Sequence, residues 1–120
     1  VTAGYETAMH LDARAIFAER QDGKMTLRRG FSLSSGERAL IVEDVVTTGG
    51  SVKEIIALVK DSGAEIVGVG SLINRGEEDN PFGVRFEHLQ RLHVQTWEPA
   101  DCPLCKQGVP AEKPGSRARS

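Results

Sequence analysis

The stretch Ala39–Ser51, ALIVEDVVTTGGS, decides the fold of this chain. Its first four residues are apolar with no polar alternation, a pattern typical of a strand buried on both faces of a parallel sheet. Two carboxylates, Glu43 and Asp44, follow this run, and a glycine-rich turn follows them. Apolar residues then recur at helical spacing, at Val52, Ile55, Ile56 and Val59. The order of buried strand, acidic pair, glycine loop and amphipathic helix predicts an α/β fold.

The glycine loop has the chemistry of a phosphate site. Paired glycines allow the backbone to approach an anion closely, so we expect a branched side chain at Gly50 to block that approach. The start of the helix offers free N–H groups to a phosphate. Hydroxyl donors are added by Thr47, Thr48 and Ser51. The carboxylates of Glu43 and Asp44 would repel a phosphate, but they can accept hydrogen bonds from a vicinal diol or hold hydrated Mg²⁺. Together these groups indicate a phosphorylated ribose as ligand.

The segment VEDVVTTGGS, residues 42–51, resembles the phosphoribosyl-diphosphate (PRPP) signature of type I phosphoribosyltransferases. It lacks the Gly-Lys-Ser/Thr of a Walker A loop and the GxGxxG of a dinucleotide-binding loop. The resemblance implies a mainly parallel sheet flanked by helices, as in other Rossmann-like folds. The alternative is an ordinary strand, loop and helix with a solvated acidic pair.

The composition is that of one soluble globular domain. The chain has 120 residues, of which 39% are hydrophobic and 27% charged, with a net charge of −2. The slight acidity argues against a nucleic-acid-binding surface. No apolar run approaches the ~18 residues of a membrane span. Two cysteines do not make a disulfide framework, so we expect a cytoplasmic protein.

The first residues are expected to form a short helix over Val1–Leu11 and a strand over Arg14–Glu19. The helix resembles the one that follows the diphosphate-binding turn in these transferases. Neither that turn nor anything before it is present in the sequence. The resemblance therefore implies a chain without its N-terminal part, including the small hood that covers the base in this family.

Four cations fall in the polar segment Arg20–Gly30. One interpretation is a solvated β-hairpin, with Asp22-Gly23 as its turn and residues 24–33 pairing back. The other is a mobile loop that closes on a diphosphate. The segment FAERQDGKMTLRRGF resembles such a loop in orotate phosphoribosyltransferases, and the resemblance assigns the diphosphate contacts to Arg20 and Lys24.

A third buried strand is predicted over Ala64–Asn74 and ends beside Arg75. Open α/β sheets bind ligands at this edge, and a guanidinium can bind a planar carboxylate such as orotate through two hydrogen bonds. In orotate enzymes an arginine at the end of this strand contacts orotate, and Arg75 matches it. The alternative is a surface arginine beside the acidic residues 77–79.

The remaining sequence predicts short strands at Val84–Leu89 and Leu92–Thr96, with the phenylalanines and Trp97 in the core. Cys102 and Cys105 form a CPLC motif, which supplies only two of the roughly four ligands of a structural zinc site. Neither a zinc site shared by two chains nor a redox role is favoured. The CPLC and PGSR of the tail are similar to tails of some orotate phosphoribosyltransferases. We expect a core domain at 1–105 and a partly disordered tail at 106–120.

These resemblances imply an orotate phosphoribosyltransferase that makes orotidine monophosphate and diphosphate from orotate and PRPP, with Mg²⁺ held mainly through PRPP, in the pyrimidine (UMP) pathway. They also imply a homodimer that shares the basic loop between subunits. Catalytic roles are expected for Glu43, Asp44 and Lys24. PRPP contacts are expected from Arg20, Lys24, Glu43, Asp44, Val45, Val46, Thr47, Thr48, Gly49, Gly50 and Ser51, and orotate contacts from Thr47 and Arg75. The alternatives are a purine or uracil phosphoribosyltransferase, or a PRPP-sensing regulator of the same fold.

Overall fold

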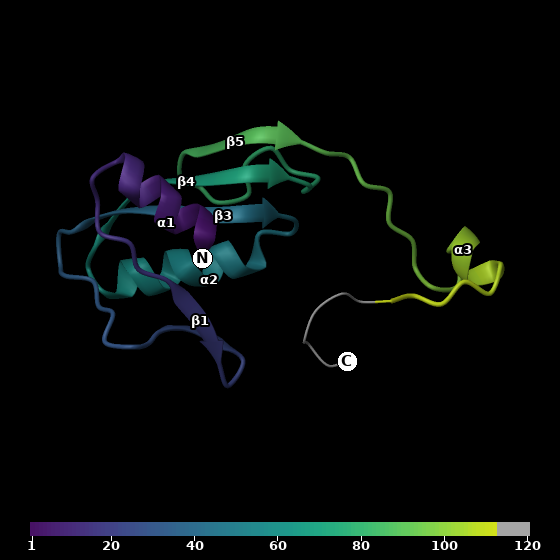
Figure 1. Cartoon of the computed structure of the whole chain (residues 1–120), viewed down its shortest axis with the longest axis horizontal. Coiled ribbons are helices and arrows are strands. Elements are labelled where there is room, and N and C mark those ends of the chain that lie inside the picture. Colours follow the sequence, from purple (N-terminus) through teal and green to yellow (C-terminus); the bar gives the residue numbers. More distant parts are fainter. Residues whose placement is uncertain (113–120) are drawn as a thin grey trace.

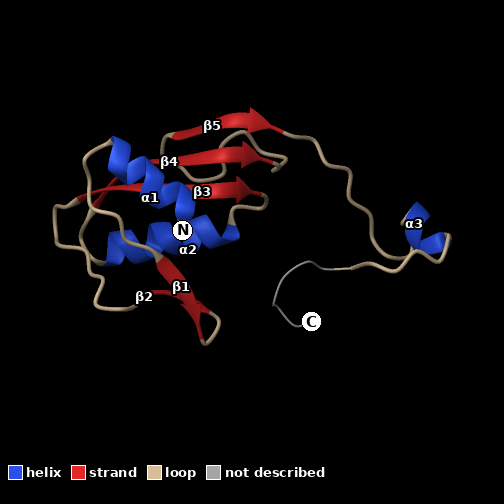
Figure 2. Ribbon diagram, in the orientation of Figure 1, coloured by secondary structure: helices blue, strands red, loops and turns tan. Residues whose placement is uncertain are grey.

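The computed structural model describes residues 1–112. Figures 1 and 2 show a small sheet flanked by helices, with a hairpin below it and an extended C-terminal segment. The elements in chain order are α1 (Thr2–His10), β1 (Ala18–Gln21), β2 (Lys24–Leu27), β3 (Arg38–Val46), α2 (Gly50–Asp61), β4 (Glu65–Asn74), β5 (Phe86–Arg91) and α3 (Pro103–Lys106). The predicted strand and helix of the glycine-loop stretch are therefore confirmed.

The main sheet has the order β3-β4-β5, and both of its strand pairs are parallel. Parallel neighbours need a crossover, and α2 provides it between β3 and β4. The register pairs Val46 with Asn74, so β3 and β4 end side by side. The predicted α/β class with a parallel sheet is confirmed.

The core lies between the sheet and α2. The helix contributes three buried residues, Val52, Ile56 and Val59. They pack with Ile41 of β3 and Val69 of β4. This is the apolar stripe that the helical spacing predicts, and its burial fixes α2, with the glycine loop at its start, against the end of β3.

The basic segment is a β-hairpin. β1 and β2 pair antiparallel with Gln21 opposite Lys24, in a two-stranded sheet separate from the main one. Asp22 and Gly23 both have positive φ, at 49° and 81°, as the two-residue turn of a hairpin requires. The strand predicted over Arg14–Glu19 is therefore misplaced, because this turn fixes the register and the pairing begins only at Ala18.

The chain leaves the sheet after β5. Residues 92–99 run away from the body as irregular chain and lead to α3, which stands apart (Figure 1). The strand predicted at Leu92–Thr96 is absent. β5 pairs with β4, which ends at Asn74 opposite Arg91, so the later residues have no neighbouring strand among the described residues to pair with. Trp97 is 45% exposed, so its prediction as a core residue is wrong, whereas Phe82 is buried as predicted.

The domain division at residue 105 stays a prediction, and most of the predicted tail, 113–120, lies outside the described residues. Within residues 1–112, no helix combines the length and hydrophobicity that a membrane crossing needs.

Candidate functional site

The acidic pair lies within β3, which continues past the apolar run to Val46. Neighbouring side chains of a strand normally point to opposite faces. Here the backbone N–H of Asp44 donates to Glu43 Oε1 at 3.1 Å, and the two carboxyl groups are close enough to shift one another's pKa. Glu43 is half-buried and Asp44 is exposed. Both acids can therefore face one ligand even though the strand does not end between them.

The two carboxyl groups differ in their proton affinity. Burial raises the pKa of Glu43 above its usual value, and the hydrogen bond with Asp44 raises it further. The same hydrogen bond lowers the pKa of Asp44, as does the backbone N–H of Val45, which donates to Asp44 Oδ1 at 2.7 Å. Glu43 therefore binds a proton more readily than Asp44 does.

The glycine loop joins β3 to α2 through Gly49, the N-cap of α2. Gly49 is buried and has a φ of 77°, in the left-handed region that glycine adopts without strain. A Cβ atom there would lie 2.7 Å from Cε1 of Phe82. Gly50 has a different environment, since its nearest neighbour would be Thr48 Oγ1 at 3.7 Å. The loop conformation thus requires glycine at 49, whereas at 50 only a ligand would require it.

The start of α2 is open to an anion. Thr47 and Thr48 are exposed, and Ser51 is half-buried. No side chain of the described residues caps this end of the helix. Its first N–H groups and the neighbouring hydroxyls are consequently available to a phosphate.

Arg75 lies beside this loop at the carboxyl edge of the sheet. Its backbone N–H donates to the carbonyl of Val46 at 2.7 Å. The next residue, Gly76, is so close to the loop that a Cβ atom would lie 2.5 Å from the carbonyl oxygen of Thr47. The Arg75 side chain is exposed, and its guanidinium makes no hydrogen bond or ion pair within residues 1–112. The structure thus brings this arginine and the glycine loop to one edge.

Two residues that the sequence analysis did not select hold this edge together. Asn74 is 0% exposed, and its Oδ1 accepts from the N–H of Gly76 at 2.9 Å. Arg91, at the end of β5, donates to the carbonyls of Gly76 and Glu77 at 3.0 and 2.9 Å. An asparagine that ends an apolar run was a visible signal for the first residue. Nothing in the sequence pattern indicated the second.

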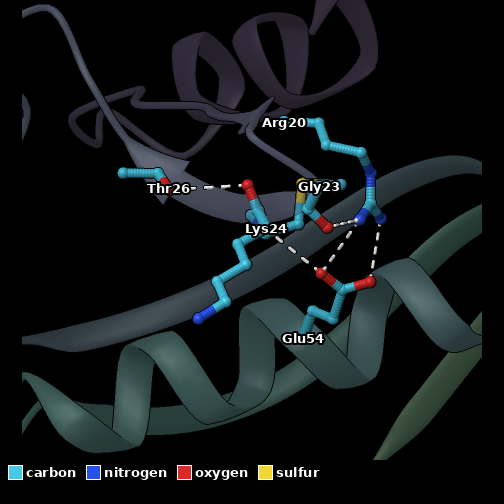
Figure 3. A network of polar contacts seen from close by, with 6 residues as sticks. Arg20, Gly23, Lys24, Thr26 and Glu54 are labelled. Atoms are coloured by element: carbon cyan, nitrogen blue, oxygen red, sulfur yellow. Dashed lines mark hydrogen bonds and ion pairs between the residues drawn. The ribbon is translucent and has the colours of Figure 1, made fainter.

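The basic hairpin packs on α2 through Glu54. Arg20 forms an ion pair with Glu54 at 2.8 Å and donates to the carbonyl of Gly23 (Figure 3). The backbone N–H of Met25 also donates to Glu54, at 3.3 Å. The side chain of Lys24 is exposed, and its amine points away from this network (Figure 3). Of the two predicted diphosphate contacts, Arg20 thus pairs with the helix that follows the glycine loop, whereas the amine of Lys24 has no hydrogen-bond or ion-pair partner within residues 1–112.

An open groove lies between α1 and the sheet. Asp44 and Leu72 line its sheet side, and Thr7 and His10 are among the α1 residues on the other side. Asp44, the more acidic member of the pair, therefore faces open space beside the helix.

The sequence matches the profile of the phosphoribosyl transferase domain over residues 7–82, which include the acidic pair, the glycine loop and Arg75. This match spans well over half of the chain. The chain belongs to the phosphoribosyl transferase family. The family resemblance of the PRPP signature is thereby confirmed.

Curated relatives and solved structures agree with this family. The chain is 58% identical to the orotate phosphoribosyltransferase of Thermotoga petrophila and 54% identical to that of Caldanaerobacter subterraneus, each over 98% of this chain. It covers 63% and 62% of these relatives, so it spans less than two thirds of their length. The adenine phosphoribosyltransferase of Rhodothermus marinus is similar in structure, with a TM-score of 0.57 and 28% identity, over 74% of this chain and 62% of that one.

The ion pair of Arg20 with Glu54 gives a first testable expectation. Glu54→Gln should increase hydrogen exchange in the hairpin peptide 18–27, measured by mass spectrometry, because the amide loses the charge that holds Arg20. Arg20 lowers the pKa of Glu54, so the stabilising effect is complete above the ordinary glutamate pKa of about 4.3 and disappears as the pH falls through the lower folded value.

Glu87→Gln is the matched control. Its ion pair with Arg85 is exposed and is formed at the start of β5, in the main sheet and not in the hairpin. Equal exchange in the hairpin of the Glu54→Gln variant and the unchanged protein would mean that the ion pair does not hold the hairpin.

Proposed function

We propose that the protein transfers the phosphoribosyl group of PRPP to orotate, giving orotidine monophosphate and diphosphate, a step of pyrimidine (UMP) biosynthesis. The observation that carries this proposal is the unengaged guanidinium of Arg75, a residue whose backbone N–H donates to the carbonyl of Val46 beside the glycine loop. A cation at this edge suits an anionic base such as orotate. The names of the curated relatives support the same assignment.

The glycine loop would hold the 5′-phosphate of PRPP. The N–H groups and hydroxyls of residues 47–51 supply the donors, and Thr47 would also face the base. The side chain of Val46 is buried and its carbonyl accepts from Arg75, so its part in PRPP binding, like that of Val45, would be to shape the loop.

The acidic pair would bind the ribose hydroxyls. Asp44 has the lowered pKa and stays ionised to lower pH, so it would accept hydrogen bonds from the ribose hydroxyls, and Glu43 beside it would accept from them as well. As the bond to diphosphate lengthens, positive charge develops on the ribose, and an adjacent carboxylate stabilises it.

The basic hairpin would neutralise the leaving diphosphate. Lys24 is exposed and free to do so. Arg20 would have to break its ion pair with Glu54 in order to bind the diphosphate. Arg20 and Glu54 both lie near the start of α2, beside the glycine loop. We further propose that the protein is a cytoplasmic homodimer in which this hairpin serves the neighbouring subunit.

The residues present fit a Mg²⁺ ion that is carried mainly by PRPP. The exposed Asp44 carboxylate is a hard oxygen donor of the kind that Mg²⁺ or its bound water prefers. No group of three or more His, Cys, Asp or Glu residues within 1–112 could form a protein cage for a metal. Mg²⁺ would neutralise charge on the diphosphate.

The test is Arg75→Ala, with each substrate varied in steady-state kinetics. We expect a Michaelis constant for orotate about ten- to a hundredfold higher, the loss of one charge-assisted contact, and a nearly unchanged constant for PRPP. Arg75→Lys should recover only part of the loss, because an ammonium cannot form the two parallel hydrogen bonds that a planar guanidinium makes to a carboxylate.

Arg85→Ala removes the same charge from the exposed edge of the sheet and serves as the control. Orotate should also be preferred over uracil, adenine and hypoxanthine. Preference for a neutral base, or an orotate constant that Arg75→Ala leaves untouched, would favour another base as substrate. PRPP binding without turnover of any base would favour a PRPP-sensing regulator.

A further inference from the structure

Cys102 and Cys105 form a pair of thiols outside the proposed transferase site. Both are free, with Cys102 partly exposed and Cys105 exposed. The backbone N–H of Cys105 donates to Cys102 Sγ at 3.5 Å. The Cys102 side chain is therefore turned toward the residue that carries the second thiol.

The backbone around the pair has the geometry of one helical turn. The N–H of Lys106 donates to the carbonyl of Cys102 at 3.0 Å, which closes that turn. Residues three apart in such a turn, as Cys102 and Cys105 are, lie about 5 Å apart between Cα atoms. Disulfides bridge Cα separations of about 4.4–6.8 Å, so the bridge can close without moving the backbone far.

The contacts make the two sulfurs unequal. The hydrogen bonds from the backbone and thiol of Cys105 lower the pKa of Cys102, while the contact with Cys102 raises the pKa of Cys105. The thiolate is the nucleophile in exchange with a disulfide. Cys102 is thus the attacking sulfur and Cys105 the resolving one.

The position of the pair leaves it accessible. It lies on α3, which the extended residues 92–99 carry away from the sheet (Figure 1). The pair cannot bind a metal with further ligands from the described part of its own chain, because residues 1–112 hold no cluster of three suitable side chains.

We propose that Cys102 and Cys105 are a redox-active dithiol that small organic disulfides, such as glutathione disulfide, oxidise to an intramolecular disulfide. The Cys102 thiolate attacks one sulfur of the organic disulfide, whose S–S bond breaks, and a mixed disulfide forms as one thiolate leaves. Cys105 loses its proton, attacks Cys102 Sγ and expels the second thiolate. The protein loses two electrons and two protons, and the organic disulfide becomes two thiols.

The test is incubation of the chain with glutathione disulfide, followed by thiol alkylation and intact-mass measurement. The unchanged protein should lose both thiols together, without accumulating a glutathione adduct. Cys105→Ser should stop at an adduct on Cys102, because no resolving thiol remains. Cys102→Ser should form its adduct severalfold more slowly, because the backbone N–H that donates to Cys102 Sγ remains in the Cys105→Ser variant, whereas no backbone N–H of the described residues donates to Cys105 Sγ.

The serine variants leave the sheet core untouched, so circular dichroism should be the same for all three proteins. Equal adduct rates in the two variants, or an accumulating adduct in the unchanged protein, would overturn the proposal. So would thiols that react only after a chelator removes zinc from a dimer, which would make the pair half of a shared zinc site.

Discussion

Gly49→Val is expected to abolish PRPP binding while the fold is retained. Gly49 has a φ of 77°, where a non-glycine residue costs about 1–2 kcal/mol and a β-branched one more. The added Cβ would also lie 2.7 Å from Phe82, which is buried in the core. The loop must move to relieve this contact, and its N–H groups then no longer converge on the phosphate. Losing two charge-assisted hydrogen bonds weakens binding by more than about a hundredfold.

Calorimetric titration with PRPP measures this effect, and circular dichroism with thermal unfolding checks the fold. Gly36→Val is the matched control. Gly36 has the same φ of 77°, but a Cβ atom there would meet nothing within 4 Å. The control should lose stability and keep its PRPP affinity. If Gly49→Val binds PRPP as well as the control does, the loop is not the phosphate site.

The second large effect is expected from Glu43→Gln combined with Asp44→Asn. Turnover should fall about a hundred- to a thousandfold, the usual cost of removing electrostatic stabilisation from a transition state. PRPP affinity should change much less, because the ribose hydroxyls can still form hydrogen bonds to amides. Steady-state turnover and calorimetric affinity, measured on the same variant, separate the two contributions.

A variant with Glu77→Gln and Glu78→Gln removes the same two charges from an exposed loop and controls for net charge. It should turn over normally. Equal losses of turnover and PRPP affinity in the acidic-pair variant would reduce Glu43 and Asp44 to ribose binders without a role in the transition state.

The sequence by itself determined the central unit of the fold. An unbroken apolar run predicts a strand buried on both faces, and the stripe from Val52 to Val59 predicts the helix that covers it. Both signals are local, since each depends on the periodicity of adjacent residues. The places of the candidate site residues could also be predicted, because the acids and the glycine loop lie in or next to these elements and Arg75 follows the next apolar run, whereas their roles stay predictions.

Only the tertiary structure decided which side chains meet across the sheet and the hairpin. Arg20 pairs with Glu54, and Phe82 packs against Gly49, although the partners are distant in sequence. Gly76 is held by hydrogen bonds with Asn74 and Arg91, which belong to no motif. Periodicity carries no information about such contacts, because they depend on strand order and register. For the same reason the sequence could not show that the loop conformation requires glycine at position 49 but not at position 50.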